Sequence, residues 1–209
     1  MIKLKEFQER AVSDLLDSCN RLIGSPENEI CIFEAPTGSG KTIMTAEFLK
    51  RFAKENSGDK KFSFIWVSVR RLHTQSRDKL EKYYERDQAL RCSEFKELSD
   101  QNLIDEDEIL FLNWESIRSE ERTIITREDK ETDHHLRAVL ENTKAEGREI
   151  ILVIDESHHS ANTEKALKLI DMIDPKITIE MSATPYLKQG RGGARNSIDF
   201  QVGFCLDQT

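Results

Sequence analysis

Residues 29–54 read EICIFEAPTGSGKTIMTAEFLKRFAK, and they carry the strongest local signal for the fold. It opens with a short apolar run, continues through a turn rich in glycine, and ends in a segment whose apolar residues recur at helical spacing. That spacing gathers one broad apolar stripe on a helix, formed by Ile43, Met44, Ala46, Phe48, Leu49, Phe52 and Ala53. The stretch therefore predicts a strand, a tight turn and an amphipathic helix in direct succession.

The same alternation of strand and helix patterns extends along most of the chain. Five short apolar runs lie at 30–33, 62–69, 109–112, 150–154 and 177–179. Four of them are nearly continuous, which is typical of strands covered on both faces in a parallel sheet. Helical patterns fall between them at 42–54, 72–84 and 163–173, and a further helix is expected at 132–143. This order predicts an α/β fold with a mostly parallel central sheet and helices on both faces.

Length and composition narrow the class of protein. A chain of 209 residues suits one large domain with a substantial core. With 37% hydrophobic and 33% charged residues, the chain is too apolar for a disordered polymer and too polar for a membrane protein. The N-terminus has no apolar stretch behind a basic head, and no cysteines form a CxxC pair. These features predict a soluble cytoplasmic protein with reduced thiols and no membrane partner.

The net charge limits how the chain could contact nucleic acid. A formal charge of -8 argues against a protein that coats nucleic acid generally, because phosphate binding leaves an electropositive footprint. Any such contact must therefore be local. Basic residues gather at Arg70, Arg71, Lys79 and Lys82, where the alternatives are a segregated basic patch and a solvated mixed-charge surface.

The turn at 35–42 reads APTGSGKT and has the strand and helix context that a phosphate-binding loop requires. Gly38 and Gly40 allow the backbone N–H groups and the helix N-terminus to point at phosphate. Lys41 would neutralise the β- and γ-phosphates, and the Thr42 hydroxyl would bind Mg²⁺. The alternative is a glycine-rich turn with an exposed lysine. The predicted nucleotide-binding residues are Pro36, Thr37, Gly38, Ser39, Gly40, Lys41 and Thr42.

A second motif, IILVIDESHH at 150–159, delivers two carboxylates to the end of a predicted strand. Ligands of open α/β sheets collect at the carboxyl ends of the strands, so Asp155 is expected near Thr42 and the metal. Asp155 would hold Mg²⁺ mainly through water, and Glu156 would orient and deprotonate the attacking water. Together with Lys41 they form the predicted catalytic set; taken alone, an acidic pair here could be a helix N-cap. His158 is expected to link the nucleotide site to a neighbouring loop.

With APTGSGKT, DESH and SATP (182–185) in this order, the chain resembles the superfamily-two helicases of the DExH branch. The resemblance implies a RecA-like P-loop NTPase that binds ATP and Mg²⁺. LKEFQERAV at 4–12 is similar to the adenine-recognition segment of that family, with Phe7 near the base and Gln8 at its edge. The resemblance implies that Ser182 and Thr184 couple the γ-phosphate to the nucleic-acid groove; taken alone, SATP could equally be an ordinary turn before Pro185.

Two further segments extend the resemblance. WVSVRRLHTQ at 66–75 is similar to a motif that touches the nucleic-acid backbone, which makes Arg70, Arg71 and His73 candidates for phosphate contacts. FLNWESI (111–117), IILVIDESHHSA (150–161) and DPKITIEMSATP (174–185) look most like the restriction subunit of type III restriction enzymes. This implies an ATP-driven motor on double-stranded DNA that works beside a methyltransferase (modification) subunit.

The resemblance also divides the chain. Residues 1–185 are expected to form the first RecA-like, ATP-binding lobe of a helicase, and residues 186–209 an irregular basic, glycine-rich tail. Within the tail, 198–206 is either an additional strand or an irregular end. The second RecA-like lobe, with its arginine fingers, and the endonuclease domain are expected outside this chain, so the lobe alone should hydrolyse ATP weakly or not at all. The alternatives are a DExH RNA helicase lobe, and a nucleotide-binding or partner-docking module without turnover.

Overall fold

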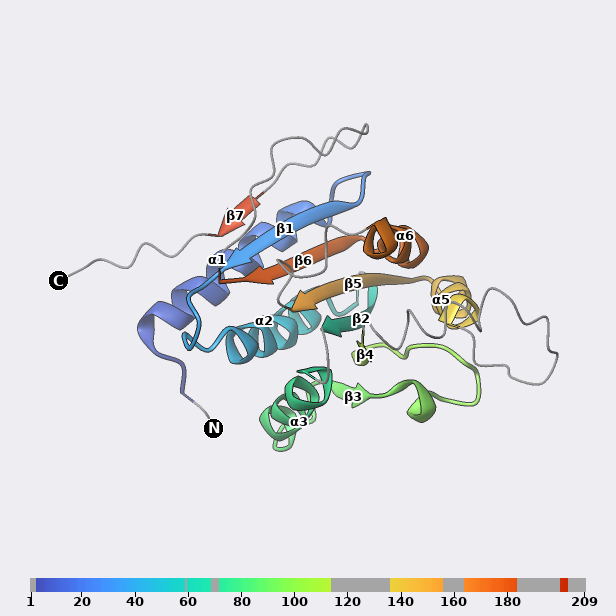
Figure 1. Ribbon diagram of the computed structural model, residues 1–209, viewed down its shortest axis with the longest axis horizontal. Helices are drawn as coiled ribbons and strands as arrows, with labels where there is room; N and C mark the ends of the chain where they lie inside the picture. The colour runs from blue at the N-terminus through green and yellow to red at the C-terminus, as the bar shows by residue number, and fades with distance from the viewer. Residues whose placement is uncertain are drawn as a thin grey trace.

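A parallel sheet forms the centre of the molecule. The computed structural model describes residues 3–58, 60–68, 72–113, 136–155, 164–183 and 200–202, and within them it has seven strands in the order β3-β4-β2-β5-β6-β1-β7 (Figure 1). Every pair of neighbouring strands is parallel. The strands are β1 (Glu29–Glu34), β2 (Lys61–Ser68), β3 (Arg91–Ser93), β4 (Glu108–Asn113), β5 (Arg148–Asp155), β6 (Ile177–Ser182) and β7 (Phe200–Val202).

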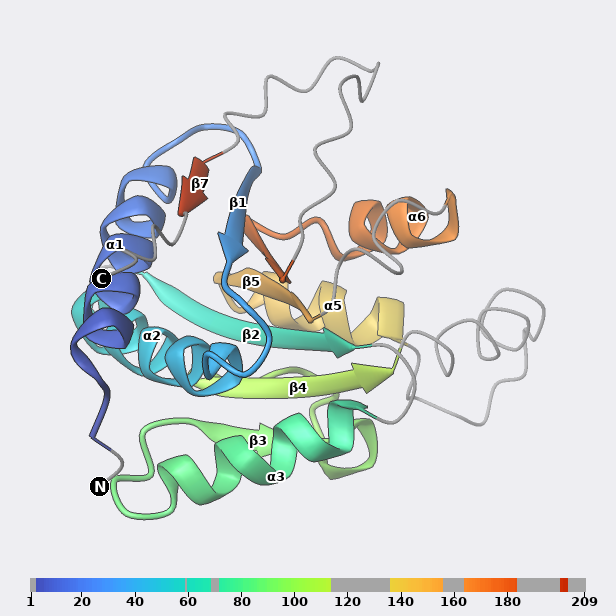
Figure 2. The same cartoon turned by 60° about the vertical axis from the view of Figure 1, so that its left-hand side comes forward.

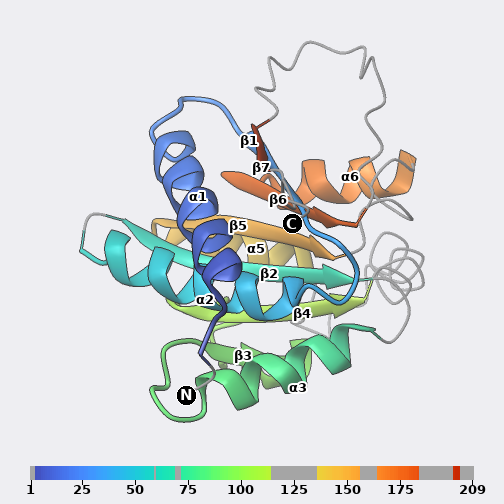
Figure 3. The same cartoon turned by 90° about the vertical axis from the view of Figure 1, so that its left-hand side faces the viewer.

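Helices cover both faces of this sheet. The first face carries α1 (Glu6–Leu22), α2 (Lys41–Asn56) and α3 (Leu72–Tyr84), and the second face carries α5 (Leu136–Ala145) and α6 (Glu164–Ile173) (Figures 2 and 3). A short 3-10 helix, η1 (Phe95–Glu97), follows β3. The predicted α/β class, with a parallel sheet between two helical layers, is confirmed.

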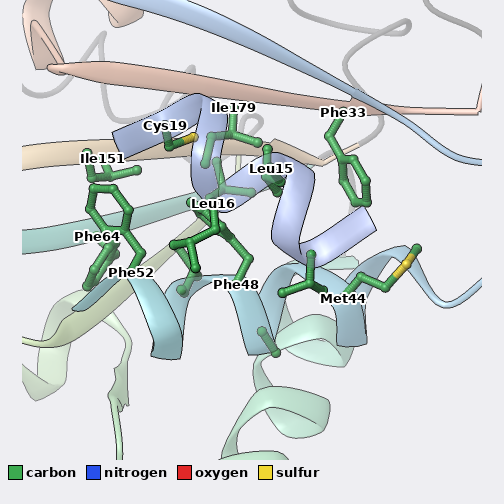
Figure 4. Packing of buried hydrophobic residues seen from close by; sticks show 14 of the residues in the cluster. Leu15, Leu16, Cys19, Phe33, Met44, Phe48, Phe52, Phe64, Ile151 and Ile179 are labelled. Atoms are coloured by element: carbon green, nitrogen blue, oxygen red, sulfur yellow. The ribbon is translucent and has the colours of Figure 1, made fainter. Parts of the chain in front are cut away.

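The buried residues divide into two clusters, one on each face. Along β5, Ile151 and Val153 join the first-face cluster, whereas Leu152 and Ile154 join the second, as the alternation of a strand requires. Figure 4 shows the first-face cluster, in which Leu15, Leu16 and Cys19 of α1 and Met44, Phe48 and Phe52 of α2 meet Phe33, Phe64, Ile151 and Ile179 of the sheet. Each fully buried side chain of this size contributes roughly 1.5–3 kcal/mol through burial.

Polar contacts tie the three helices of the first face together. Arg51 of α2 lies between two carboxylates, donating to Glu47 of its own helix at 2.7 Å and to Glu9 of α1 at 2.7 Å. The Tyr83 hydroxyl of α3 donates to Glu47 at 2.5 Å, and its burial together with this bond raises the pKa of Tyr83. The bond to Glu9 fixes the N-terminal half of α1 against α2, and the bond from Tyr83 fixes α3 against α2.

Most predicted elements appear close to their expected bounds. The helix expected at 72–84 is α3, and those expected at 42–54 and 163–173 are α2 and α6 with ends shifted by one or two residues. The helix expected at 132–143 corresponds to α5, although residues 132–135 lie outside the described residues. In the tail, β7 pairs with β1. Across the described residues, no helix is both long enough and apolar enough to span a membrane.

Candidate nucleotide-binding and active site

The glycine-rich loop (residues 35–40) joins the end of β1 to the start of α2. Its turn is closed by the Ser39 N–H, which donates to the Pro36 carbonyl oxygen at 3.1 Å. Gly38 and Gly40 have φ values of +80° and +92°, a region that a side chain disfavours. Gly40 is the N-cap of α2 and supplies no side-chain cap, so the first N–H groups of the helix face the loop. This arrangement has the form of an anion-binding site.

The Lys41 side chain folds back over this loop. Its ammonium group donates to the Ala35 carbonyl oxygen at 2.9 Å, and the residue is only 9% exposed. A buried ammonium at the mouth of a helix N-terminus concentrates positive charge at one point. The loop therefore offers both backbone donors and a cation to a phosphate group.

Gln8 of α1 holds the loop from the other side. Its side-chain Oε1 accepts from the Lys5 N–H at 2.9 Å, and its Nε2 donates to the Ser39 carbonyl oxygen at 2.8 Å. A Cβ atom added at Gly40 would lie 2.7 Å from this Nε2, so the amide packs directly on the loop backbone. Phe7 is half-buried, with the Lys5 ammonium 6.0 Å from its ring centroid.

Asp155 lies at the same edge of the sheet as the loop, the carboxyl edge, where β1, β6 and β5 end side by side. Phe33 pairs with Met181, and Met181 pairs with Asp155, so β1 and β5 flank β6 in one row. The strands β1 and β5 are therefore two strand spacings apart, about 10 Å. By alternation along β5, Asp155 follows Val153 onto the first face, which α2 covers. The Thr45 hydroxyl of α2 contacts the Met181 sulfur at 2.8 Å in this row, and Thr42 lies one turn earlier on α2.

A hydroxyl that the sequence motifs did not single out contacts Asp155. The Ser76 hydroxyl of α3 donates to Asp155 Oδ2 at 3.3 Å, and both residues are buried. A signal for Ser76 exists, because the buried positions of α3 are Ser76, Leu80 and Tyr84, spaced by four residues. A serine at a helix position that otherwise carries buried apolar or aromatic residues is the sequence signal that could have identified Ser76.

Two more serines lie buried at the carboxyl edge. Ser182 ends β6, and its carbonyl oxygen accepts from the Ala35 N–H at 3.1 Å, which joins β6 to the start of the glycine-rich loop. Ser68 ends β2 on the first face, in the row next to Asp155. Its hydroxyl is buried and has no hydrogen-bond partner among the residues that the structure describes. The sequence motifs predicted a role for Ser182 but not for Ser68.

Several predicted site residues lie outside the described residues, namely Arg70, Arg71, Glu156, His158 and Thr184. His73 is described as half-buried in the first turn of α3, with Nε2 3.4 Å from the Thr74 hydroxyl. Its contact with nucleic acid stays a prediction.

The oxygen-bearing side chains at the carboxyl edge suit a hard cation. Thr42 supplies a hydroxyl and Asp155 a carboxylate, which are ligand types that Mg²⁺ accepts together with water and phosphate oxygens. Within the described ranges, no group of three or more His, Cys, Asp or Glu residues could hold a metal ion. A metal at this edge would therefore need oxygen atoms from the nucleotide and water, as is usual for MgATP sites.

Two solved structures have a fold similar to that of this chain. A Sulfolobus solfataricus SWI2/SNF2 ATPase core in complex with double-stranded DNA is 20% identical with a TM-score of 0.56, covering 88% of this chain and 32% of that chain. A nuclease-deletion mutant of the Type ISP restriction-modification enzyme LlaGI, in complex with a DNA substrate mimic, is 15% identical with a TM-score of 0.55. That match covers 97% of this chain and 20% of the other. The chain thus spans a third or less of these larger proteins and shares their RecA-like ATPase fold.

Sequence comparison identifies the family. No curated protein matches this chain significantly. The family described as type III restriction enzyme, res subunit, matches residues 1–187, which include the glycine-rich loop and Asp155. The chain therefore belongs to the family of type III restriction enzyme res subunits, whose matched domain is a helicase-like, nucleotide-binding ATPase core.

Proposed function

We propose that this chain is the ATP-binding motor lobe of a DNA-dependent ATPase, the res subunit of a type III restriction-modification system. One observation carries the proposal: the glycine-rich loop and Asp155 share the carboxyl edge and the first face of the sheet. In this function a second RecA-like lobe and a nuclease domain complete the enzyme, and a methyltransferase subunit accompanies it.

The roles of the residues follow from their chemistry. Lys41 and the N-terminus of α2 bind the β- and γ-phosphates. Thr42 and Asp155 hold Mg²⁺, which when bound neutralises phosphate charge and orients the triphosphate. Glu156 follows Asp155 in the sequence and orients and deprotonates the attacking water. Phosphoryl transfer depends mainly on such positioning and charge stabilisation.

The adenine end of the nucleotide is assigned to Phe7 and Gln8. The Gln8 amide makes two hydrogen bonds, to the Lys5 N–H and the Ser39 carbonyl oxygen. A side-chain amide has two donor hydrogens and two acceptor lone pairs, so one of each is left for the edge of a base. Because Gln8 also holds the glycine-rich loop, occupation of the base site and the shape of the phosphate site are linked.

Double-stranded DNA is the proposed track of the motor. The proposal rests on the family and on the DNA complexes of the two solved relatives. With a net charge of -8, the contact must be local, and Arg70, Arg71 and His73 are the proposed phosphate contacts. Ser182 and Thr184 couple the nucleotide to that surface through β6, whose end is bonded to the glycine-rich loop.

The test is ATP hydrolysis by the full-length protein with and without double-stranded DNA, in the wild type and in Lys41→Ala. We expect Lys41→Ala to lower DNA-stimulated turnover on the order of 10²–10³-fold, since it removes a cation that faces developing charge. Lys54→Ala is the matched control, because Lys54 is an exposed lysine near the far end of the same helix.

Three results would contradict this function or favour a different one. Undiminished turnover in Lys41→Ala would reject the assigned site. Stimulation by RNA in place of double-stranded DNA would favour an RNA helicase lobe. Nucleotide binding that depends on Lys41, with no turnover under any condition, would favour a nucleotide-binding or partner-docking module.

A further inference from the structure

The bond between Ser76 and Asp155 joins two elements that are far apart in the sequence. Ser76 lies in the second turn of α3, and Asp155 is the last residue of β5, 79 positions later. Ser76 is 5% exposed and Asp155 is 8% exposed, so water competes little for either group. At 3.3 Å the hydroxyl is within reach of the carboxyl group but farther away than in a short, strong hydrogen bond, so its main effect is on orientation.

Ser76 uses its hydroxyl differently from an ordinary buried helical serine. Serine within a helix usually donates to the carbonyl four residues earlier, and Ser18 of α1, also 5% exposed, does so toward Asp14 at 2.8 Å. A hydroxyl has one proton to donate, and that of Ser76 goes to Asp155. The local backbone therefore does not account for the position of the Ser76 hydroxyl.

The helix that carries Ser76 is held firmly in place. One turn below, Leu80 is fully buried, and two turns below, the Tyr84 hydroxyl donates to the Ala46 carbonyl oxygen of α2 at 2.8 Å. On the outer side, Arg77 bonds Glu94 and Glu97 near η1 at 3.0 Å each. An anchored helix can hold a hydroxyl at a fixed point beside the carboxylate.

We propose that Ser76 is a positioning residue for Asp155: its hydroxyl fixes the rotation of the carboxylate that binds Mg²⁺ and so joins α3 to the metal site. The inference rests on the proposed function, in which Asp155 holds the ion of MgATP. It adds that α3 and the metal site respond to each other, since a shift of α3 removes the donor from Asp155. α3 begins at Leu72, directly after the proposed DNA contacts Arg70 and Arg71.

The inference predicts a specific loss of metal affinity. Groups that orient a metal ligand typically change metal affinity 10- to 100-fold when removed. Since the bond is long at 3.3 Å, we expect the lower end of that range, about ten-fold. Nucleotide affinity without metal should not change. Among the described residues, the Ser76 side chain bonds Asp155 and not the glycine-rich loop.

The experiment measures equilibrium binding of a non-hydrolysable ATP analogue to the full-length protein across a titration of Mg²⁺, and again in a chelator. Two variants are compared with the wild type, Ser76→Ala and Ser76→Cys; the thiol of the second fills the space of the hydroxyl and slightly more, but donates weakly. Ser18→Ala is the control for loss of an equally buried hydroxyl. Thermal unfolding of each variant verifies that it is folded.

We expect both Ser76 variants to need about ten-fold more Mg²⁺ for half-maximal binding, with unchanged affinity in the chelator, and Ser18→Ala to match the wild type. A wild-type Mg²⁺ requirement in a folded Ser76 variant would overturn the inference. Lys41→Ala separates this from failure of the proposed function: if its nucleotide binding equals that of the wild type, the site assignment itself is wrong.

Discussion

The two edges of the sheet use polar side chains in different ways. At the carboxyl edge, Lys41 bonds the backbone of the glycine-rich loop, and Ser76 bonds Asp155. At the opposite edge, the amino edge, where the strands begin, polar groups hold turns in place. Glu108 at the start of β4 accepts from the Asp105 N–H at 2.7 Å and from the Ser93 hydroxyl.

Other residues of the amino edge act in the same way as Glu108. Arg148 at the start of β5 donates to the Ile104 carbonyl oxygen at 3.0 Å, and Lys176 before β6 donates to the carbonyl oxygens of Ser25 and Glu27. These side chains replace backbone partners that the turns lack. We therefore expect substitutions at the amino edge to change stability, and substitutions at the carboxyl edge to change nucleotide chemistry.

The largest contrast is expected for Asp155→Asn. The amide keeps an acceptor oxygen for Ser76 but loses the charge that we propose to face Mg²⁺, so turnover should fall on the order of 10³-fold while the free energy of unfolding changes by less than about 1 kcal/mol. ATPase assays and urea unfolding of the full-length protein measure both quantities, with exposed Asp17→Asn as control. A stable variant with normal turnover would contradict the division between the edges.

Glu108→Ala probes the amino edge. The carboxylate is fully buried, and its removal leaves the Ser93 hydroxyl and the Asp105 N–H without their acceptor. We expect the free energy of unfolding to fall by about 2–4 kcal/mol, with nucleotide affinity unchanged in the folded protein. The exposed neighbour Glu106→Ala is the control and should be nearly neutral. Weakened nucleotide binding in folded Glu108→Ala would argue against separate roles for the edges.

Gly40→Ala should have a smaller effect, which combines backbone strain with displacement of the Gln8 side chain from the loop. Alanine at φ +92° costs about 1–2 kcal/mol, and its Cβ atom would meet Gln8 Nε2 at 2.7 Å. Gly147→Ala at the amino edge is the matched control, because φ is +74° and nothing lies within 4 Å of the added atom. Both variants should lose similar stability, and only Gly40→Ala should lose nucleotide affinity. Equal affinities in the two variants would show that the Gln8 contact has no effect on the loop.

Much of the fold could be predicted because the deciding signals are local. Continuous apolar runs marked β1, β2, β4, β5 and β6, and helical spacing marked α2, α3 and α6. β3 gave no such signal: it has three residues, and its strand conformation depends on pairing with β4. The segment that forms α1 also has a helical signal, because its buried residues from Ala11 to Leu22 recur at helical spacing, beyond the predicted base contacts Phe7 and Gln8.

In the site, too, features formed by neighbouring residues were predictable from the sequence, and contacts between distant residues were not. The glycine-rich loop was predictable because its residues are contiguous, and the edge for Asp155 followed from parallel strands. The bond from Ser76 to Asp155 and that from Gln8 to Ser39 join residues 79 and 31 positions apart. No pattern within a short window encodes such a contact, because it depends on how helices pack on the sheet.

In the proposed site, Thr42 and Asp155 share the metal ion of a bound nucleotide. The most direct measurement is a crystal structure of the protein with a non-hydrolysable ATP analogue and Mn²⁺, which an anomalous signal locates. We predict one ion about 2.0–2.2 Å from the Thr42 hydroxyl oxygen and bound to Asp155 directly or through one water. An ion or nucleotide located away from the glycine-rich loop, or an ion at the loop beyond the reach of Asp155, would contradict the account.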